Sequence, residues 1–281
     1  MGTLFIVATP IGNLEDLTFR ALRTLREVDV IAAEDTRRTA KLLAHYEIQK
    51  SMVSLHEHNE HREAPRLVAR LLKGESIALV SDAGTPGIAD PGARLVREAR
   101  DAGVQVVPIP GPSAITAALS VAGIDSPEFV FMGFAPAKSG ARLRWLEELS
   151  VERKTIVFFE VPHRIRACML DVSIVLVERH ILVFREISKL NFELVEKQNT
   201  AAVKELGEFV IIVGQAAEER VSDSSAILAS EIVGYLTNND RIDSRKAELA
   251  AAVAVGIDPS RSAEAVRQGN KLVKKQKMAA P

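Results

Sequence analysis

The chain has 281 residues, enough for about two domains at the usual size of roughly 100–200 residues each. Apolar residues make up 47% of the chain and charged residues 26%, a balance that supplies ample core and excludes general disorder. The chain has a single cysteine, Cys168, and no apolar run near the roughly 20 residues that a membrane span needs, so we predict a cytoplasmic protein. Because the net charge is -1, any polyanionic partner requires a local basic patch.

Short apolar runs alternate with segments of helical periodicity through the first half of the chain. Phe19, Leu22, Leu25 and Val28, for example, recur at the spacing of one helix face. The strands predicted in this half lie at residues 4–8, 30–33, 52–55, 77–80 and 104–109. Strands that alternate with helices predict a mostly parallel sheet with helices on both faces.

The same alternation begins again in the second half of the chain. Strands are predicted at residues 129–134, 155–159, 181–184 and 209–213. We therefore expect two α/β domains, residues 1–113 and 114–221, with a cleft between them. From residue 222 the pattern becomes helical and polar, which predicts a helical extension, residues 222–281, with a basic tail at 271–277.

Glycine, proline and ionisable residues follow each predicted strand of the first half. The five loops begin at Thr9, Glu34, His56, Ser81 and Pro110. Because the carboxyl ends of parallel strands share one edge of a sheet, where open α/β folds bind ligands, we place the functional site at that edge.

The loop after the first strand does not match a phosphate-binding motif. It contains one glycine, Gly12, and Pro10 removes a backbone donor, which disfavours both a dinucleotide fingerprint and a P-loop. In the loop at Ser81, the small residues around Gly84 let a ligand approach the backbone, and the Asp82 carboxylate can accept hydrogen bonds from amine or hydroxyl donors. A structural Asx turn at Asp82 is the alternative.

Two further groups of polar residues are ambiguous. His56, His58 and His61 alternate along the chain but lack further ligands at suitable spacing, so we expect no metal and interpret them as hydrogen-bonding groups. The mixed-charge stretches at residues 160–164 and 185–189 are either ion-paired surface or a site that holds a charged substrate.

Five motifs, in order and at similar spacing, resemble those of the ribosomal RNA small subunit methyltransferase I family. They are Val7-Ala8-Thr9-Pro10-Ile11-Gly12-Asn13-Leu14, Ala33-Glu34-Asp35-Thr36-Arg37, His56-Glu57-His58-Asn59-Glu60, Val80-Ser81-Asp82-Ala83-Gly84-Thr85-Pro86 and Pro108-Ile109-Pro110-Gly111-Pro112-Ser113-Ala114. The resemblance is strong from the N-terminus through about Pro136 and weaker from there to about Gly214. It implies the tetrapyrrole methylase-like (class III methyltransferase) fold, with S-adenosylmethionine (SAM) between two α/β domains. It also implies 2′-O-methylation of a decoding-centre cytidine in 16S rRNA of the small ribosomal subunit, usually by a homodimer.

The resemblance and the strand-end positions together imply the residues of the site. Those expected to contact SAM are Thr9, Pro10, Gly12, Asp82, Gly84, Thr85, Ser113, Ala114 and Phe159. Because a ribose hydroxyl is a very weak acid, a nearby group must accept its proton. The candidates are Glu34, Asp35, His56, Glu160 and Glu193, of which Glu34 and Asp35 are favoured. The residues expected to bind or orient RNA are Arg37, His56, His58, Asn59, Arg164, Arg185 and Lys189.

The chain departs from the family pattern at Phe192, where family members carry the first of two glutamates and this chain keeps only Glu193. Two alternatives stay open on the sequence. One is a methylase of the same fold that acts on a tetrapyrrole or a protein histidine, and the other is an RNA-binding factor without catalysis.

Overall fold

The structure is a computed structural model that describes the whole chain apart from residues 126, 178, 197–202, 216–222, 240–243, 256–261 and 280–281. The chain divides into two compact units, Met1–Ala216 and Ala217–Pro281. Among the described residues, no helix is both long enough and apolar enough to cross a membrane.

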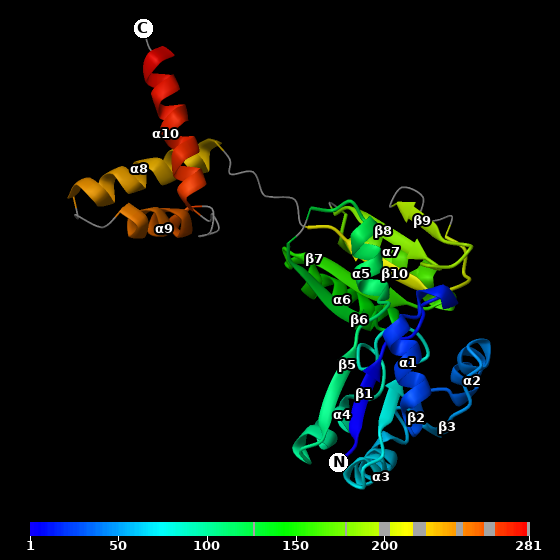
Figure 1. The fold of residues 1–281 in the computed structure, drawn as a ribbon. Helices are drawn as coiled ribbons and strands as arrows, with labels where there is room; N and C mark the ends of the chain where they lie inside the picture. Colours follow the sequence, from blue (N-terminus) through cyan, green and yellow to red (C-terminus); the bar gives the residue numbers. More distant parts are fainter. Residues whose placement is uncertain are drawn as a thin grey trace. The chain divides into compact units, whose positions relative to one another are not determined.

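The first sheet of unit 1 is fully parallel, in the strand order β3-β2-β4-β1-β5 (Figure 1). Its strands are β1 (Thr3–Val7), β2 (Val30–Ala33), β3 (Ser51–Ser54), β4 (Ile77–Val80) and β5 (Gln105–Ile109). Every residue of β2 and β4 is buried, as is typical of the interior of a parallel sheet. The predicted parallel α/β sheet is therefore confirmed.

Helices cover both faces of this sheet. On one face, α1 (Phe19–Glu27) and α2 (Thr36–His45) pack through Leu25 and Leu43. On the other, α3 (Glu60–Leu72) and α4 (Ala93–Asp101) pack through Leu67 and Leu95. The 3-10 helix η1 (Leu14–Asp16) precedes α1. Each helix of the first pair begins at a side-chain cap, because the Thr18 hydroxyl accepts from the N–H of Ala21 and the Asp35 carboxylate accepts from the N–H of Arg37.

The second sheet of unit 1 is mixed, in the order β6-β7-β10-β8-β9. Its strands are β6 (Phe129–Phe134), β7 (Thr155–Glu160), β8 (Ile181–Arg185), β9 (Glu193–Glu196) and β10 (Phe209–Val213), and only the β6–β7 pair is parallel. The edge strand β9 was not predicted, because its sequence, Glu-Leu-Val-Glu, carries charges at both ends.

Helices also lie on both faces of the second sheet. Helix α5 (Ala114–Val121) packs on one face through Ile115 and Ala118. Helices α6 (Ser139–Ser150) and α7 (Ile165–Val175) cover the other, and the 3-10 helix η2 (Pro162–Arg164) precedes α7. All strands of the first sheet precede α5 and all strands of the second follow it, so we retain the proposed division between residues 113 and 114.

Unit 2 is helical, as predicted for this part of the chain. It consists of α8 (Asp223–Asn239), α9 (Ser244–Ala254) and α10 (Ser262–Ala279). Small residues let α8 and α10 approach closely: a Cβ added at Gly269 would lie 2.0 Å from the carbonyl oxygen of Ala226. The Ser230 hydroxyl donates to Asn270 Oδ1 across the same contact at 2.8 Å.

A buried ion pair fixes the chain next to the end of β6. The Arg142 side chain is 2% exposed and its Nη2 lies 2.6 Å from Asp171 Oδ2, which joins α6 to α7. Arg142 also donates to the carbonyl oxygens of Pro136 and Ala137, just after β6. Removing one partner leaves the other charge buried without compensation.

We therefore expect Asp171→Ala to lower the free energy of unfolding by about 3 kcal/mol, measured by urea denaturation. The control is Glu98→Ala, which breaks the exposed Arg94–Glu98 pair on α4 and should cost less than about 1 kcal/mol. Equal losses in the two variants would contradict a structural role for the buried pair.

Candidate functional site

Hydrogen bonds join the loops that follow β1, β4 and β5. The N–H of Thr9 donates to the carbonyl oxygen of Gly84 at 2.8 Å, and the N–H of Gly84 donates back to Thr9 at 3.0 Å. The Thr9 hydroxyl donates to the carbonyl oxygen of Ser81, and the Thr85 hydroxyl to that of Pro112. Gly84 has a φ of +78°, which residues with a side chain rarely adopt. The backbone pairing between Thr9 and residue 84 therefore depends on glycine at this position.

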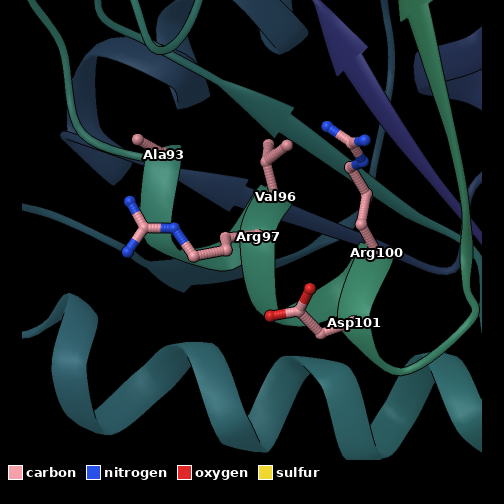
Figure 2. Close-up of a pocket in the computed structure, with 5 residues that line it drawn as sticks. All are labelled: Ala93, Val96, Arg97, Arg100 and Asp101. Carbon is pink, nitrogen blue, oxygen red and sulfur yellow. The ribbon is translucent and has the colours of Figure 1, made fainter.

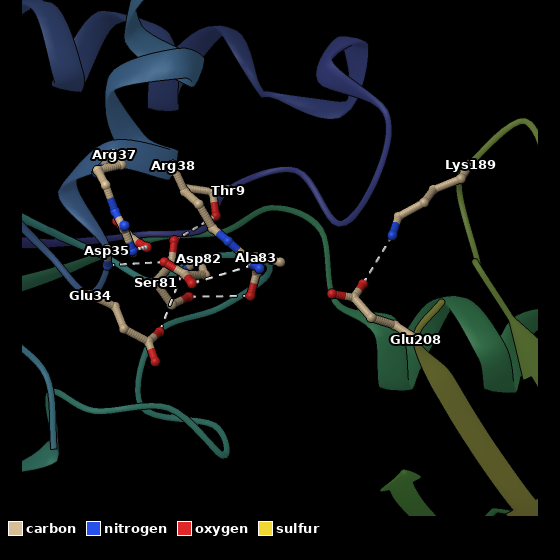
Figure 3. A network of polar contacts seen from close by, with 10 residues as sticks. All are labelled: Thr9, Glu34, Asp35, Arg37, Arg38, Ser81, Asp82, Ala83, Lys189 and Glu208. Carbon is tan, nitrogen blue, oxygen red and sulfur yellow. Dashed lines mark hydrogen bonds and ion pairs between the residues drawn. The ribbon is translucent and has the colours of Figure 1, made fainter. Parts of the chain in front are cut away.

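Asp82 connects the loop after β4 to the loop after β2, as Figure 3 shows. Asp82 Oδ1 accepts from the N–H of Asp35 at 3.0 Å, and the N–H of Asp82 donates to Glu34 Oε2 at 3.4 Å. Arg38 Nη1 lies 3.4 Å from Asp82 Oδ2. These contacts join Asp82 to a separate loop and are not those of an Asx turn, since the N–H of Gly84 donates to Thr9. The Asp82 carboxylate retains lone pairs that can accept from a ligand.

A pocket of about 270 Å³ lies between the two sheets of unit 1, at the carboxyl end of the first sheet. We call residues 1–113 the first lobe of unit 1 and residues 114–216 the second lobe. The first lobe contributes polar side chains to the lining of the pocket: Glu34, Arg38, Asp82, Thr85 and Asp90. Ser113, the last residue of the first lobe, also lines the pocket. The second lobe contributes Ala114 at the start of α5, and Phe134, Phe159 and Glu160 at the ends of β6 and β7. The pocket therefore combines an acidic wall with an apolar, aromatic wall.

A second hollow, of about 460 Å³, lies on α4 and is shown in Figure 2. Its lining residues are Ala93, Val96, Arg97, Arg100 and Asp101, which all come from one helix. It therefore lacks opposing walls and convergent polar groups, so we place the site in the pocket between the sheets.

The acidic wall of the pocket has two carboxyl groups whose protonated forms are favoured. Burial raises the pKa of Glu34, and the nearby Asp82 carboxylate raises it further. Burial, the Glu34 carboxylate and the Asp82 carboxylate together raise the pKa of Asp90 to about 6. A carboxylate with a raised pKa is a stronger base than usual and therefore a better acceptor of a substrate proton.

Asp35, the neighbour of Glu34, has the opposite character. Its carboxylate caps α2 and accepts from the Arg37 side chain, at 2.8 Å between Oδ2 and Nη2. These hydrogen bonds from Arg37 lower the pKa of Asp35 well below its usual value. Asp35 does not line the pocket, so of the two favoured proton acceptors the geometry favours Glu34.

The charged residues predicted in the second lobe form internal ion pairs. Glu160, whose side chain is 0% exposed, contacts Arg164 Nη2 at 2.6 Å, and its Oε2 has no hydrogen-bond partner among the described residues. Arg185 Nε lies 2.7 Å from Glu193 Oε2. Lys189 Nζ lies 2.8 Å from Glu186 Oε1.

One hydrogen bond joins the loop that contains Lys189 to the first lobe: the Ser188 hydroxyl donates to the Asp16 carboxylate. Glu186 and Ser188 have positive φ angles of 56° and 68°, which non-glycine residues seldom adopt. Lys189 packs so closely on Gly12 that a Cβ there would lie 2.3 Å from Lys189 Cγ. Gly12 thus permits the contact between the lobes.

The predicted site residues divide into two groups. Those that line the pocket are Glu34, Asp82, Gly84, Thr85, Ser113, Ala114, Phe159 and Glu160. Those outside its lining are Thr9, Pro10, Gly12, Asp35, Arg37, His56, His58, Asn59, Arg164, Arg185, Lys189 and Glu193.

The histidine loop has a local structural function. The Asn59 side chain accepts from the N–H of His56 and donates to the carbonyl oxygen of Ser54, which closes the turn into α3. His58 is exposed, and no group of three potential metal ligands occurs among the residues that the structure describes.

Sequence reasoning did not single out three polar residues that line the pocket: Arg38, Asp90 and Glu208. Asp90 follows the loop at Asp82 by eight residues, and its acidic character next to Pro91 and Gly92 was the signal available for it. Arg38 lies one residue beyond Arg37, but on a helix that step turns its side chain toward Asp82.

The family model described as Tetrapyrrole (Corrin/Porphyrin) Methylases matches residues 3–204. Similar proteins named Ribosomal RNA small subunit methyltransferase I occur in several bacteria. That of Xylella fastidiosa is 47% identical over 90% of this chain and 94% of its own length. That of Pseudomonas aeruginosa is 41% identical over 91% of this chain and 93% of its own length. That of Haemophilus influenzae is 53% identical over 67% of this chain and 67% of its own length.

Solved structures share the fold at low sequence identity. The methyltransferase CobJ matches with a TM-score of 0.56 and 18% identity, over 79% of this chain and 98% of that chain. The uroporphyrin-III C-methyl transferase of Thermus thermophilus, complexed with S-adenyl homocysteine, matches with a TM-score of 0.54 and 17% identity, over 76% and 98%. These likenesses confirm the predicted two-domain α/β fold.

The raised pKa of Asp90 predicts a pH-dependent stability difference. Its carboxyl has a pKa of about 6 in the folded chain against a usual 3.8, so folding favours the protonated form. The stability that this group contributes is complete below pH 3.8 and is lost as the pH rises toward and past about 6. Asp90→Asn removes this loss. We expect the melting temperature of the variant, minus that of the parent, to increase between about pH 4 and about pH 7. A constant difference across that range would contradict the assignment.

Proposed function

The chain belongs to the tetrapyrrole methylase family, and within it we propose that the protein is a SAM-dependent rRNA methyltransferase that methylates the 2′-hydroxyl of a decoding-centre cytidine in 16S rRNA. The observation that carries the proposal is the identity of 41–53% to proteins named as small subunit rRNA methyltransferases, over two thirds or more of the chain. The pocket supports it, because four of the five strand-end loops that carry the resemblance contribute to its lining.

The chemistry of the pocket is compatible with SAM. The Asp82 carboxylate can accept from ribose hydroxyl or amine donors, and Thr85 and Ser113 add hydroxyl groups. Gly84 and Ala114 leave room beside the backbone, and Phe159 offers an aromatic face to an adenine ring. We propose that these residues hold the cofactor, which supplies a methyl group activated as a sulfonium.

We propose Glu34 as the acceptor of the ribose hydroxyl proton. Its carboxylate lines the pocket and has a raised pKa, which brings its basicity closer to neutral pH. Glu34 would take the proton of the hydroxyl as its oxygen acquires the methyl group, and bound SAM would supply that methyl group with a neutral thioether as the leaving group. Glu160 also lines the pocket, but its Oε1 is paired with Arg164.

The cations proposed to orient RNA differ in accessibility. The Arg37 side chain is 87% exposed although it pairs with Asp35, and the pocket-lining Arg38 is 61% exposed. Arg164, Arg185 and Lys189 are less exposed and carry carboxylate partners. We therefore propose Arg37 and Arg38 as phosphate contacts, and assign the other three to holding the pocket wall in position.

We further propose that the protein works in the cytoplasm as a homodimer, on rRNA or on the small ribosomal subunit, as its resemblance to the rRNA methyltransferases implies. Transfer of tritiated methyl groups from SAM to small ribosomal subunits tests the substrate. Transfer to a tetrapyrrole instead would support the alternative methylase. A chain without SAM affinity in calorimetry would support a noncatalytic RNA-binding factor.

Filling the pocket at Ala114 should weaken cofactor binding. We expect Ala114→Leu to lower SAM affinity by about tenfold or more in calorimetry, because the added carbons occupy space beside Phe159. Thr116→Leu is the matched control, since Thr116 is exposed on the same helix and does not line the pocket. If Ala114→Leu binds SAM with the parental affinity, the proposal that SAM binds in this pocket is contradicted.

Replacing the proposed proton acceptor should affect catalysis and not cofactor binding. We expect Glu34→Gln to lower kcat for subunit methylation by about 100-fold or more, with SAM affinity retained, because the amide cannot accept the proton. Asp35→Ala is the comparison, and it should retain most of the methylation activity. If Asp35→Ala abolishes transfer and Glu34→Gln does not, the assignment of the acceptor is reversed.

A further inference from the structure

Helix α1 presents an aromatic side chain to solvent. Phe19, its first residue, is 93% exposed, whereas Ala21 and Leu25 of the same helix are buried against the first sheet. The helix would form and pack without an aromatic group at this position. The ring offers an uncovered aromatic face of the kind on which nucleic-acid bases stack.

The helices on this face of the sheet also carry unbalanced positive charge. Helices α1 and α2 contain six basic side chains, Arg20, Arg23, Arg26, Arg37, Arg38 and Lys41, and one acidic side chain, Glu27. Arg20, Arg23 and Lys41 are exposed, and none of them pairs with a carboxylate among the described residues. Arg26 donates to the carbonyl oxygen of Tyr46.

The helices on the opposite face have a different balance. Helices α3 and α4 also contain six arginines, but these are accompanied by four acidic residues, Glu60, Glu63, Glu98 and Asp101. Arg62 and Arg66 both contact Glu63, and Arg94 contacts Glu98. Arg97 and Arg100 of α4 are also exposed. Both faces therefore carry an excess of positive charge, and it is larger on the α1–α2 face, which has six basic side chains against one acidic side chain.

The α1–α2 face adjoins the pocket through the chain that leads into each helix. Glu34 lines the pocket immediately before Asp35 caps α2, and Arg38 of α2 lines the pocket as well. Ile11 lines the pocket a few residues before α1, and η1 between them contacts the second lobe through Asp16. A polymer bound on this face can thus reach the pocket without crossing the sheet.

From these observations, and resting on the proposed function, we propose that the exposed face of α1 with the first turns of α2 is the docking surface for a single-stranded segment of RNA. Arg20 and Arg23 bind phosphates flanking the target nucleotide, and an unpaired base stacks on Phe19. Phosphate contacts by arginine supply affinity and register, and base stacking on an aromatic side chain adds affinity that tolerates any base. The observation that favours RNA over a second copy of the chain is the unpaired positive charge around the aromatic ring.

The test uses the full chain, 16S rRNA and three variants: Phe19→Ala, the double variant Arg20→Ala/Arg23→Ala, and the matched control Arg97→Ala/Arg100→Ala. The control removes the same charge from the exposed face of α4. RNA affinity is measured by filter binding at several salt concentrations. SAM affinity, melting temperature and sedimentation of each variant are measured alongside, and all three should stay at the parental values.

We expect the Arg20→Ala/Arg23→Ala variant to weaken RNA binding about tenfold or more and to reduce the slope of log affinity against log salt by about 2. Phe19→Ala should weaken binding about tenfold and leave that slope unchanged, because stacking releases no counterions. The α4 control should bind as the parent does.

Parental RNA affinity in both α1 variants overturns the proposal, as does an equal loss in the α4 control. A change in sedimentation on Phe19→Ala also overturns it, because the face is then an interface between copies of the chain. Methylation of subunits by the parent protein tests the proposed function separately from the proposed docking surface. If the parent methylates subunits and the α1 variants bind RNA normally, only the docking surface is refuted. A parent that neither binds nor methylates rRNA refutes both.

Discussion

The Asp82 carboxylate is the interaction on which the pocket depends. It accepts from the backbone of Asp35 and contacts Arg38, so the ends of β2 and β4 are held in one arrangement. The Thr9–Gly84 hydrogen bonds and the Thr85–Pro112 hydrogen bond extend this arrangement to the ends of β1 and β5. Burial is the main cause of the raised pKa values of Glu34 and Asp90, and the same Asp82 carboxylate raises both further.

Charge is distributed differently in the two lobes of unit 1. In the second lobe, Arg185 is almost buried and Arg164 is partly buried, and each has a carboxylate partner because an uncompensated charge in that environment is costly. In the first lobe, the arginines of α1 lie in solvent, where no partner is needed to keep them charged. Arg164 and Arg185 are thus held within the fold, whereas the arginines of α1 are accessible to a polyanion.

The fold and the edge of the sheet that carries the site could be predicted from sequence, but the orientation of individual side chains could not. The buried runs of β2 and β4 mark interior parallel strands, and their loops must meet at one edge. Glu34 and Asp35 are adjacent in sequence, yet only Glu34 lines the pocket, because Asp35 is drawn to the first N–H groups of α2. Asp90 returns to the pocket through Gly87 and Ala89, which have positive φ angles that no periodicity reveals.

At position 192 the resemblance implies a glutamate, and this chain carries Phe192. Phe192 stacks on Phe184 at 6.5 Å between ring centroids and does not line the pocket. Its neighbour Glu193 already pairs with Arg185, whose other guanidinium nitrogens donate to the carbonyl oxygens of Leu206 and Asn191. A second carboxylate at position 192 would lie next to an arginine that already has a carboxylate partner and two carbonyl acceptors. The aromatic side chain instead adds apolar contact next to β8, so the substitution alters the packing of the edge strand and leaves the charge balance around Arg185 intact.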